Sequence, residues 1–172
     1  MAKRGFLARH GILRNAIRKD IPYFVLPWLT VLCIEALFCT RDLIKEPQSL
    51  SSFRVEGIIG LALFIIGFVV LLVGHVTLWR NYSSFLVIHK DHQLITRGIY
   101  RFTRNPIYLG TLMALIGLPV YAASLYGFLT SLFMIPIFLY RIRLEEGLLA
   151  EEFQEAFQKY KKSTKRLVPF IY

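Results

Sequence analysis

Cysteine is scarce in this sequence, and the short motifs of soluble nucleotide and metal sites are missing. Both cysteines, Cys33 and Cys39, lie in one apolar stretch, so they indicate no disulfide framework. The sequence contains no glycine-rich dinucleotide fingerprint, no phosphate-binding loop and no helical pair of metal-ligating histidines. These absences argue against soluble-type nucleotide sites, and we expect no bound metal ion.

Acidic residues are the second shortage. The chain has 11 of them against 21 lysines and arginines, which gives a formal net charge of +10. Anionic lipid headgroups account for such a surplus, and we therefore expect no nucleic acid partner. Hydrophobic residues make up 55% of the 172 positions and the mean hydropathy is +0.51, which is too apolar for a soluble domain of this length. The composition predicts a single membrane domain.

Long apolar runs predict an all-α, multi-pass transmembrane bundle with about four spans. Residues 21–40 and 57–79 each provide the roughly 20 residues that cross a hydrocarbon core about 30 Å thick. The first run has no convincing cleavage site after it, so we expect it to be retained. Residues 107–140 are too long for one span. Pro119 and the stretch 124–127 predict a hairpin of two short helices there, and one long helix kinked at Pro119 is the alternative.

Basic charge alternates with these spans and orients them. The predicted division is a leader, a first pair of spans, a loop, a hairpin and a C-terminal segment, at residues 1–20, 21–79, 80–106, 107–140 and 141–172. The leader, the loop and the C-terminal segment are rich in lysine and arginine, whereas the hairpin tip is uncharged. The positive-inside rule then places both termini in the cytoplasm, for a chain in a bacterial inner membrane or the endoplasmic reticulum.

Two amphipathic helices are expected beside the spans. The leader mixes apolar residues with arginines, as an interfacial helix on the headgroups does, although a disordered basic leader fits equally well. Residues 145–161 carry apolar side chains at helical spacing, with acids early and lysines late. That pattern predicts a C-terminal amphipathic helix whose charges match its dipole.

Two polar clusters stand out beside the apolar runs, HQLITRGIYRFTRNPIY at residues 92–108 and RIRLEE at residues 141–146. Gly98 permits a tight turn. Asn105 and Pro106 suit the N-cap and the first position of a helix. The amide groups of such an N-terminus favour a carboxylate. The first cluster thus predicts a site for a small charged ligand, and a positive collar that binds headgroups is the alternative.

Aromatic and charged side chains complement this helix start. Tyr100 and Tyr108 suit stacking on a ring or hydrogen bonding to it. Arg141 and Glu145 are one helical turn apart, and we expect them to share a helix face. A carboxylate there suits an ammonium group or a pair of ribose hydroxyls.

In order and spacing, the two clusters resemble the C-terminal half of the isoprenylcysteine carboxyl methyltransferase and phospholipid methyltransferase superfamily. The family pattern has a His-x-Leu-Val-x-x-Gly-x-Tyr segment, an Arg-His-Pro-x-Tyr turn, a glutamate pair after the last span, an aromatic helix and a Leu-x-Pro tail. This chain departs from it in the helix, where Phe157 replaces a tyrosine and Gln154 the usual glycine. The resemblance implies an integral membrane enzyme that uses S-adenosyl-L-methionine.

The resemblance also implies roles for single residues. Arg141, Glu145 and Glu146 would be catalytic, with Arg141 beside the methyl acceptor. Asn105 stands where many relatives have histidine, so the acceptor stays open between an isoprenylcysteine-type or other lipid-like group and a phosphatidylethanolamine-type amine. The cofactor site would be lined by His92, Gln93, Leu94, Ile95, Gly98, Tyr100, Arg104, Asn105, Pro106, Ile107, Tyr108 and Glu145.

Two ionisable residues lie within the predicted spans, Glu35 deep in the first and His75 late in the second. Such groups are costly in lipid and are functional candidates by default. We expect them to pair with each other or to line the cavity of the lipid-like acceptor. For the whole chain, the competing function is a non-enzymatic scaffold or transporter subunit that binds headgroups. A transporter is disfavoured, because the sequence has no internal repeat.

Overall fold

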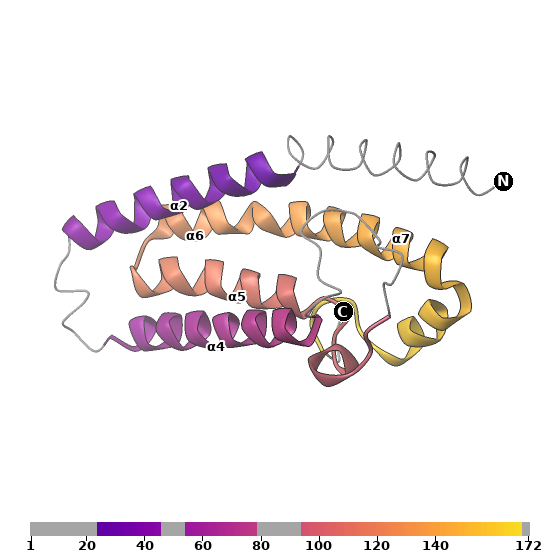
Figure 1. Cartoon of the computed structure of the whole chain (residues 1–172). Coiled ribbons are helices and arrows are strands. Elements are labelled where there is room, and N and C mark those ends of the chain that lie inside the picture. The colour runs from indigo at the N-terminus through magenta and orange to yellow at the C-terminus, as the bar shows by residue number, and fades with distance from the viewer. Residues whose placement is uncertain (1–23, 46–53, 79–93, 170–172) are drawn as a thin grey trace.

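The computed structural model describes residues 24–45, 54–78 and 94–169 (Figure 1). The expected interfacial helix of the leader lies outside these residues. Every regular element within them is helical, and an isolated bridge between Thr103 and Lys165 is the one β-type pairing described. The all-α prediction is therefore confirmed. The elements are α2 (Leu26–Lys45), α4 (Val55–Leu78), the 3₁₀ turn η3 (Gly98–Arg101), α5 (Pro106–Tyr121), α6 (Leu125–Leu132) and α7 (Met134–Ser163).

The long helices lie side by side, in the order α4, α5, α6 with α7, and α2 (Figure 1). Contacts between α4 and α5 dominate the packing, and α2 rests mainly on α6. One end of this stack carries η3, the start of α5, the second half of α7 and the C-terminal segment (Figure 1). Both polar clusters of the sequence therefore meet at the same end of the bundle.

The structure has a helical hairpin here, because α5 and α6 are separated by the short turn at residues 122–124, and its passage through a membrane stays a prediction. Ser124 caps α6, since its hydroxyl accepts a hydrogen bond from the amide of Gly127. Pro119 lies inside α5 and Gly127 inside α6, so the chain turns between these two residues rather than at either of them. The alternative of one long helix kinked at Pro119 is wrong.

The C-terminal amphipathic helix is not a separate element. Residues 145–161 belong to α7, which begins at Met134 and ends at Ser163, with a kink at Gln154. The break before α7 lies at Phe133. Pro136 explains it, because proline has no amide hydrogen for the carbonyl group of Leu132. The last apolar segment and the first part of the predicted cofactor-completing helix are thus one helix, which bends at Gln154.

Two helical segments of the described chain are long and apolar enough to cross a membrane, α4 and the joined α6–α7 segment. The helix α5 is apolar but shorter. Large hydrophobic side chains stand exposed along α4, among them Ile58, Ile65, Phe68 and Val76. Lipid is the solvent that such a surface suits. The count of four spans stays a prediction.

Glycines let α4 and α5 approach backbone to backbone. Gly60, Gly67 and Gly74 recur every seven residues on α4 and are all buried against α5. A Cβ atom on Gly67 would lie 2.6 Å from the backbone nitrogen of Ala114, and one on Gly117 would lie 2.5 Å from that of Phe64. Small residues make such close packing possible between helices in lipid. This contact fixes α5, whose N-terminus opens the candidate site.

Candidate functional site

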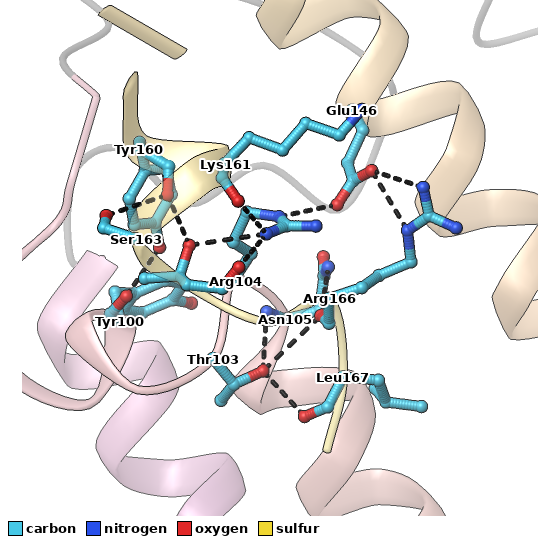
Figure 2. A network of polar contacts seen from close by, with 11 residues as sticks. Tyr100, Thr103, Arg104, Asn105, Glu146, Tyr160, Lys161, Ser163, Arg166 and Leu167 are labelled. Carbon is cyan, nitrogen blue, oxygen red and sulfur yellow. Dashed lines mark hydrogen bonds and ion pairs between the residues drawn. The ribbon is translucent and has the colours of Figure 1, made fainter. Parts of the chain in front are cut away.

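A buried ion-pair network joins the two polar clusters (Figure 2). Glu146 of α7 accepts from Arg104, with 2.8 Å between Nε and Oε1, and its Oε2 lies 3.0 Å from Nη2 of Arg166. The side chains of Arg104 and Glu146 are each 7% exposed. Pairing with two arginines satisfies a carboxylate that would otherwise be costly to bury. Glu146 thus ties α7 to both the start of α5 and the C-terminal segment.

The C-terminal segment lies across the turn that precedes α5 (Figure 2). The amide of Arg104 donates to the carbonyl oxygen of Lys165 at 2.9 Å. Thr103 Oγ1 donates to the carbonyl oxygen of Leu167 at 2.7 Å. The Arg104 guanidinium also donates to the carbonyl oxygen of Thr164. Backbone and side chains together therefore hold this segment against residues 103–105.

Tyrosines fix the turn η3 from both sides. The buried Tyr160 of α7 donates its hydroxyl to the carbonyl oxygen of Tyr100 at 2.7 Å. Burial raises the pKa of the Tyr160 hydroxyl above its usual range, partly offset by the nearby Arg104. Tyr100, also buried, directs its own hydroxyl to the carbonyl oxygen of Gly74 in α4. Gly98, at φ 61, supplies the left-handed residue that starts the turn, as the sequence predicted.

Asn105 takes the N-cap position of α5, and Pro106 follows at its first position, as predicted. The side chain of Asn105 does not cap the helix, however. Its amide Nδ2 donates to the carbonyl oxygen of Arg166 at 2.8 Å. The expected capping bond is therefore replaced by a bond to the C-terminal segment, which satisfies the same side chain in a different direction.

Glu145 is the meeting point of a second polar group. The Tyr108 hydroxyl donates to Oε1 of Glu145 at 2.6 Å, and Nε of Arg141 donates to the same oxygen at 3.1 Å. Arg141 and Glu145 share a face of α7, as their spacing predicted. The Arg141 side chain is 3% exposed, whereas that of Glu145 is 30% exposed. Glu145 is therefore held in place and still reachable.

Aromatic rings surround Arg141. Its Cζ lies 4.3 Å from the ring centroid of Phe24, just before α2. The Phe24 ring is tilted against Phe138, and Phe138 meets Tyr108 edge to face. Phe24 could not be predicted as a site residue from the sequence, because it lies far along the chain from Arg141 and no spacing pattern connects the two.

The remaining predicted residues divide into three groups. His92 and Gln93 lie outside the described residues. Leu94 and Ile95 are half-buried and belong to no regular element. The carboxyl oxygens of Glu35 have no hydrogen-bond partner among the described residues, and Nδ1 of His75 lies 3.0 Å from the carbonyl oxygen of Leu71. Glu35 therefore does not bond to His75, and the alternative that the two residues line the acceptor cavity stays a prediction. Within the described ranges no three His, Cys, Asp or Glu residues gather as metal ligands would.

This chain is similar in sequence to known methyltransferases. The family model described as phospholipid methyltransferase matches residues 55–156. A probable protein-S-isoprenylcysteine O-methyltransferase of Oryza sativa subsp. indica is 33% identical over 116 residues, which cover 66% of this chain and 61% of the relative. The protein-S-isoprenylcysteine O-methyltransferase of Saccharomyces cerevisiae is 28% identical over 142 residues, covering 81% and 59%. The chain thus spans about three fifths of the length of these relatives.

A solved structure shares the fold. It is the eukaryotic intramembrane Ras methyltransferase, isoprenylcysteine carboxyl methyltransferase, which superposes with a TM-score of 0.72. The alignment covers 84% of this chain and 52% of that protein, at 22% sequence identity. The helical arrangement therefore resembles that of this solved structure.

Proposed function

We propose that this chain, which belongs to the phospholipid methyltransferase family, is an integral membrane methyltransferase. Its acceptor is a lipid-like or isoprenylcysteine-type group at the cytoplasmic face in this proposal. The observation that carries the proposal is the group of Tyr108, Arg141 and Glu145. It combines a buried guanidinium with a reachable carboxylate. A cation and an anion side by side suit the opposite charges of a methyl donor and a carboxylate acceptor.

The residues present fit S-adenosyl-L-methionine as the methyl donor. This cofactor carries a sulfonium, an ammonium and a carboxylate, and when bound it supplies an already activated methyl group. Glu145, 30% exposed and anchored by two donors, is suited to a cationic group. The N-terminus of α5 offers backbone amides to a carboxylate. The other predicted cofactor residues, His92, Gln93, Leu94 and Ile95 among them, remain assigned to this role as a prediction.

The chain contributes mainly by orientation. Holding two reactants in line lowers a barrier by about 7–11 kcal/mol in the best intramolecular cases. In this proposal Glu145 and the α5 N-terminus hold the donor, while Arg141 pairs with the acceptor. Glu146 and Arg104 keep these elements together through their ion pair, so we assign them a holding role. The site then needs rigidity more than reactive side chains.

A carboxylate acceptor fits this site better than an amine. A carboxylate attacks without losing a proton, and arginine binds carboxylates with two parallel hydrogen bonds. An amine must lose a proton during transfer. Glu145 accepts hydrogen bonds from Tyr108 and Arg141, and such bonds favour the charged carboxylate over its protonated form. Glu145 is therefore a better anchor than a base.

A phosphatidylethanolamine-type N-methyltransferase is the second candidate, favoured by the description of the matching family model. Transfer of a labelled methyl group separates the two candidates. Purified protein in lipid nanodiscs is given a prenylated cysteine or phosphatidylethanolamine, and the products are separated by chromatography. Label in the prenylcysteine ester supports the first candidate, and label only in the phospholipid favours the second.

Calorimetry tests the cofactor assignment directly. We expect the folded protein in detergent or nanodiscs to bind S-adenosyl-L-methionine and S-adenosylhomocysteine. Glu145→Ala should abolish that binding, whereas Arg141→Ala should retain it and lose methyl transfer. Glu152→Ala, an exposed position on the same helix, is the matched control. If both site variants bind the cofactor normally, the assignment is wrong; if the folded wild type does not bind it, a non-enzymatic scaffold is the better description.

A further inference from the structure

Phe24 brings an aromatic ring to the site from outside the family match. The family model begins at residue 55, whereas Phe24 lies just before α2. Its ring centroid is 4.3 Å from Cζ of Arg141. The acceptor side of the site is therefore partly built by a segment that the family pattern does not specify.

The contact between Phe24 and Arg141 excludes water. The Arg141 side chain is 3% exposed. The Phe24 ring is stacked on Trp28 at 6.5 Å and tilted against Phe138 at 6.0 Å, so its orientation is fixed from two sides. A cation over a ring face is attracted to it, and the attraction is stronger where water is absent. Glu145 binds Nε of the same guanidinium, so the cation is held by a carboxylate and a ring together.

An apolar groove of about 510 Å³ lies between α2 and the α6–α7 segment. Leu26, which lines it, is two residues from Phe24, and Ile137, which also lines it, is one helical turn before Arg141. The hydroxyls of its two threonines, Thr30 and Thr130, are bonded to the backbone of their own helices. The groove therefore offers a mainly apolar wall, and its lining includes residues that are close in sequence to both Phe24 and Arg141.

We propose that Phe24 is a positioning residue for Arg141. Its ring holds the guanidinium at the end of the groove, so that Arg141 meets the charged end of an acceptor whose apolar chain lies in the groove. Phe24 acts through Arg141 and does not itself touch the reacting atoms. This inference rests on the proposed function, since it assigns the acceptor's orientation within the same site.

Fluorination of the ring tests the electrostatic part of this role. Mono-, di- and trifluorinated phenylalanine at position 24 progressively weaken the negative ring face with little change in shape. We expect kcat/KM for the acceptor to fall stepwise, by about tenfold at the end of the series. The calorimetric affinity for S-adenosyl-L-methionine should stay constant.

Two substitutions of Phe24 complete this test. Phe24→Trp should retain turnover and Phe24→Leu should lose it. Phe68, which stacks on Phe64 along α4, takes the same fluorines as a control with no kinetic effect. A flat series with a low Phe24→Leu value would mean that the ring only fills space, and the proposal would be wrong.

A chemical readout keeps this test independent of turnover. Phenylglyoxal modifies arginines that leave their protected position, and mass spectrometry reports the modification of Arg141 alone. We expect slow modification in the wild type and faster modification with each added fluorine at position 24. If the wild type transfers no methyl group to any acceptor, the proposed function fails, and this labelling decides the positioning role by itself. Equal labelling across the series overturns it.

Discussion

The α4–α5 contact and the polar network around Glu146 hold the same molecule together by opposite means. Between α4 and α5, glycines such as Gly67 and Gly117 have no side chain, so backbone approaches backbone at these positions. Around Glu146, ion pairs between a buried carboxylate and two arginines join the elements, in addition to the backbone hydrogen bonds of the C-terminal segment. The first contact depends on volume and the second on charge.

This difference separates scaffold from site. The close contact between the α4 and α5 backbones leaves no room for an added methyl group. Loss of an ion pair at the polar network should leave this contact unchanged. A contact made of buried charges depends on single atoms, because each lost partner leaves an uncompensated group. Substitutions in the two regions should therefore fail in different ways, by parting of the helices in one case and by release of the C-terminal segment in the other.

The largest effect is expected at Glu146. Glu146→Ala removes the carboxylate between Arg104 and Arg166, and we expect the free energy of unfolding to fall by about 3–5 kcal/mol. Denaturant titration in mixed micelles, followed by circular dichroism, measures the change. Glu151→Ala, at an exposed position on α7, is the matched control and should show no change. If Glu146→Ala behaves like the control, the backbone hydrogen bonds alone hold the C-terminal segment.

A smaller loss is expected from crowding the α4–α5 contact. A Cβ atom at position 67 would lie 2.6 Å from the backbone nitrogen of Ala114, so the helices must separate to admit it. Gly67→Ala should cost about 1–3 kcal/mol of stability. Gly57→Ala on the same helix meets open space and serves as the control. Equal melting temperatures for the two variants would contradict the volume argument, and normal cofactor affinity in the folded Gly67 variant would support the separation of scaffold and site.

The next effect concerns one hydroxyl group. Tyr160→Phe removes the hydrogen bond to the carbonyl oxygen of Tyr100, at a cost of about 0.5–1.5 kcal/mol. Because burial raises the pKa of Tyr160 in the folded state, this stabilisation is complete below the unfolded value of about 10 and is lost as the pH rises through the folded value. The stability difference between wild type and variant should therefore shrink above about pH 10. A difference that stays constant across the alkaline range would argue against this bond.

The smallest effect should be a gain. Gly147 lies inside α7 and a Cβ atom there would meet nothing within 4 Å. Gly147→Ala should raise the free energy of unfolding by about 0.4–1 kcal/mol, because it restricts the unfolded chain. Cofactor affinity, measured by calorimetry, should not change. A loss of affinity would instead place this position inside the cofactor site, beside Glu146.

Local features of the site were readable from the sequence. Asn105 and Pro106 begin α5 because their backbone preferences suit a helix start, and Arg141 meets Glu145 because helical spacing brings them together. The hairpin was readable too, since its apolar run is too long for one span. Gln154 adds a further case: the family pattern that the sequence resembles has glycine there, and Gln154 adopts φ 40, a conformation that glycine favours.

Long-range partners were not readable. Arg104 and Glu146 are 42 residues apart, and Tyr108 and Glu145 are 37 residues apart, so no periodicity connects them. Asn105 was expected to cap a helix, yet a carbonyl group 61 residues away takes its amide. Asn105 was the residue that left the methyl acceptor open in the sequence. In the structure its side-chain amide holds the C-terminal segment, so this asparagine also has a structural role.

The first part of α7 connects the apolar hairpin to the proposed site without a break in the helix. Before the kink at Gln154, residues 134–153 of α7 form a helix about 30 Å long at 1.5 Å per residue. Arg141 and Glu145 lie near the middle of this part of α7. Membranes of different thickness tilt embedded helices by different amounts. We therefore expect the chain length of the surrounding lipids to change the tilt of this helix. The Arg141 guanidinium and the Glu145 carboxylate would then move together in the proposed methyl-transfer site.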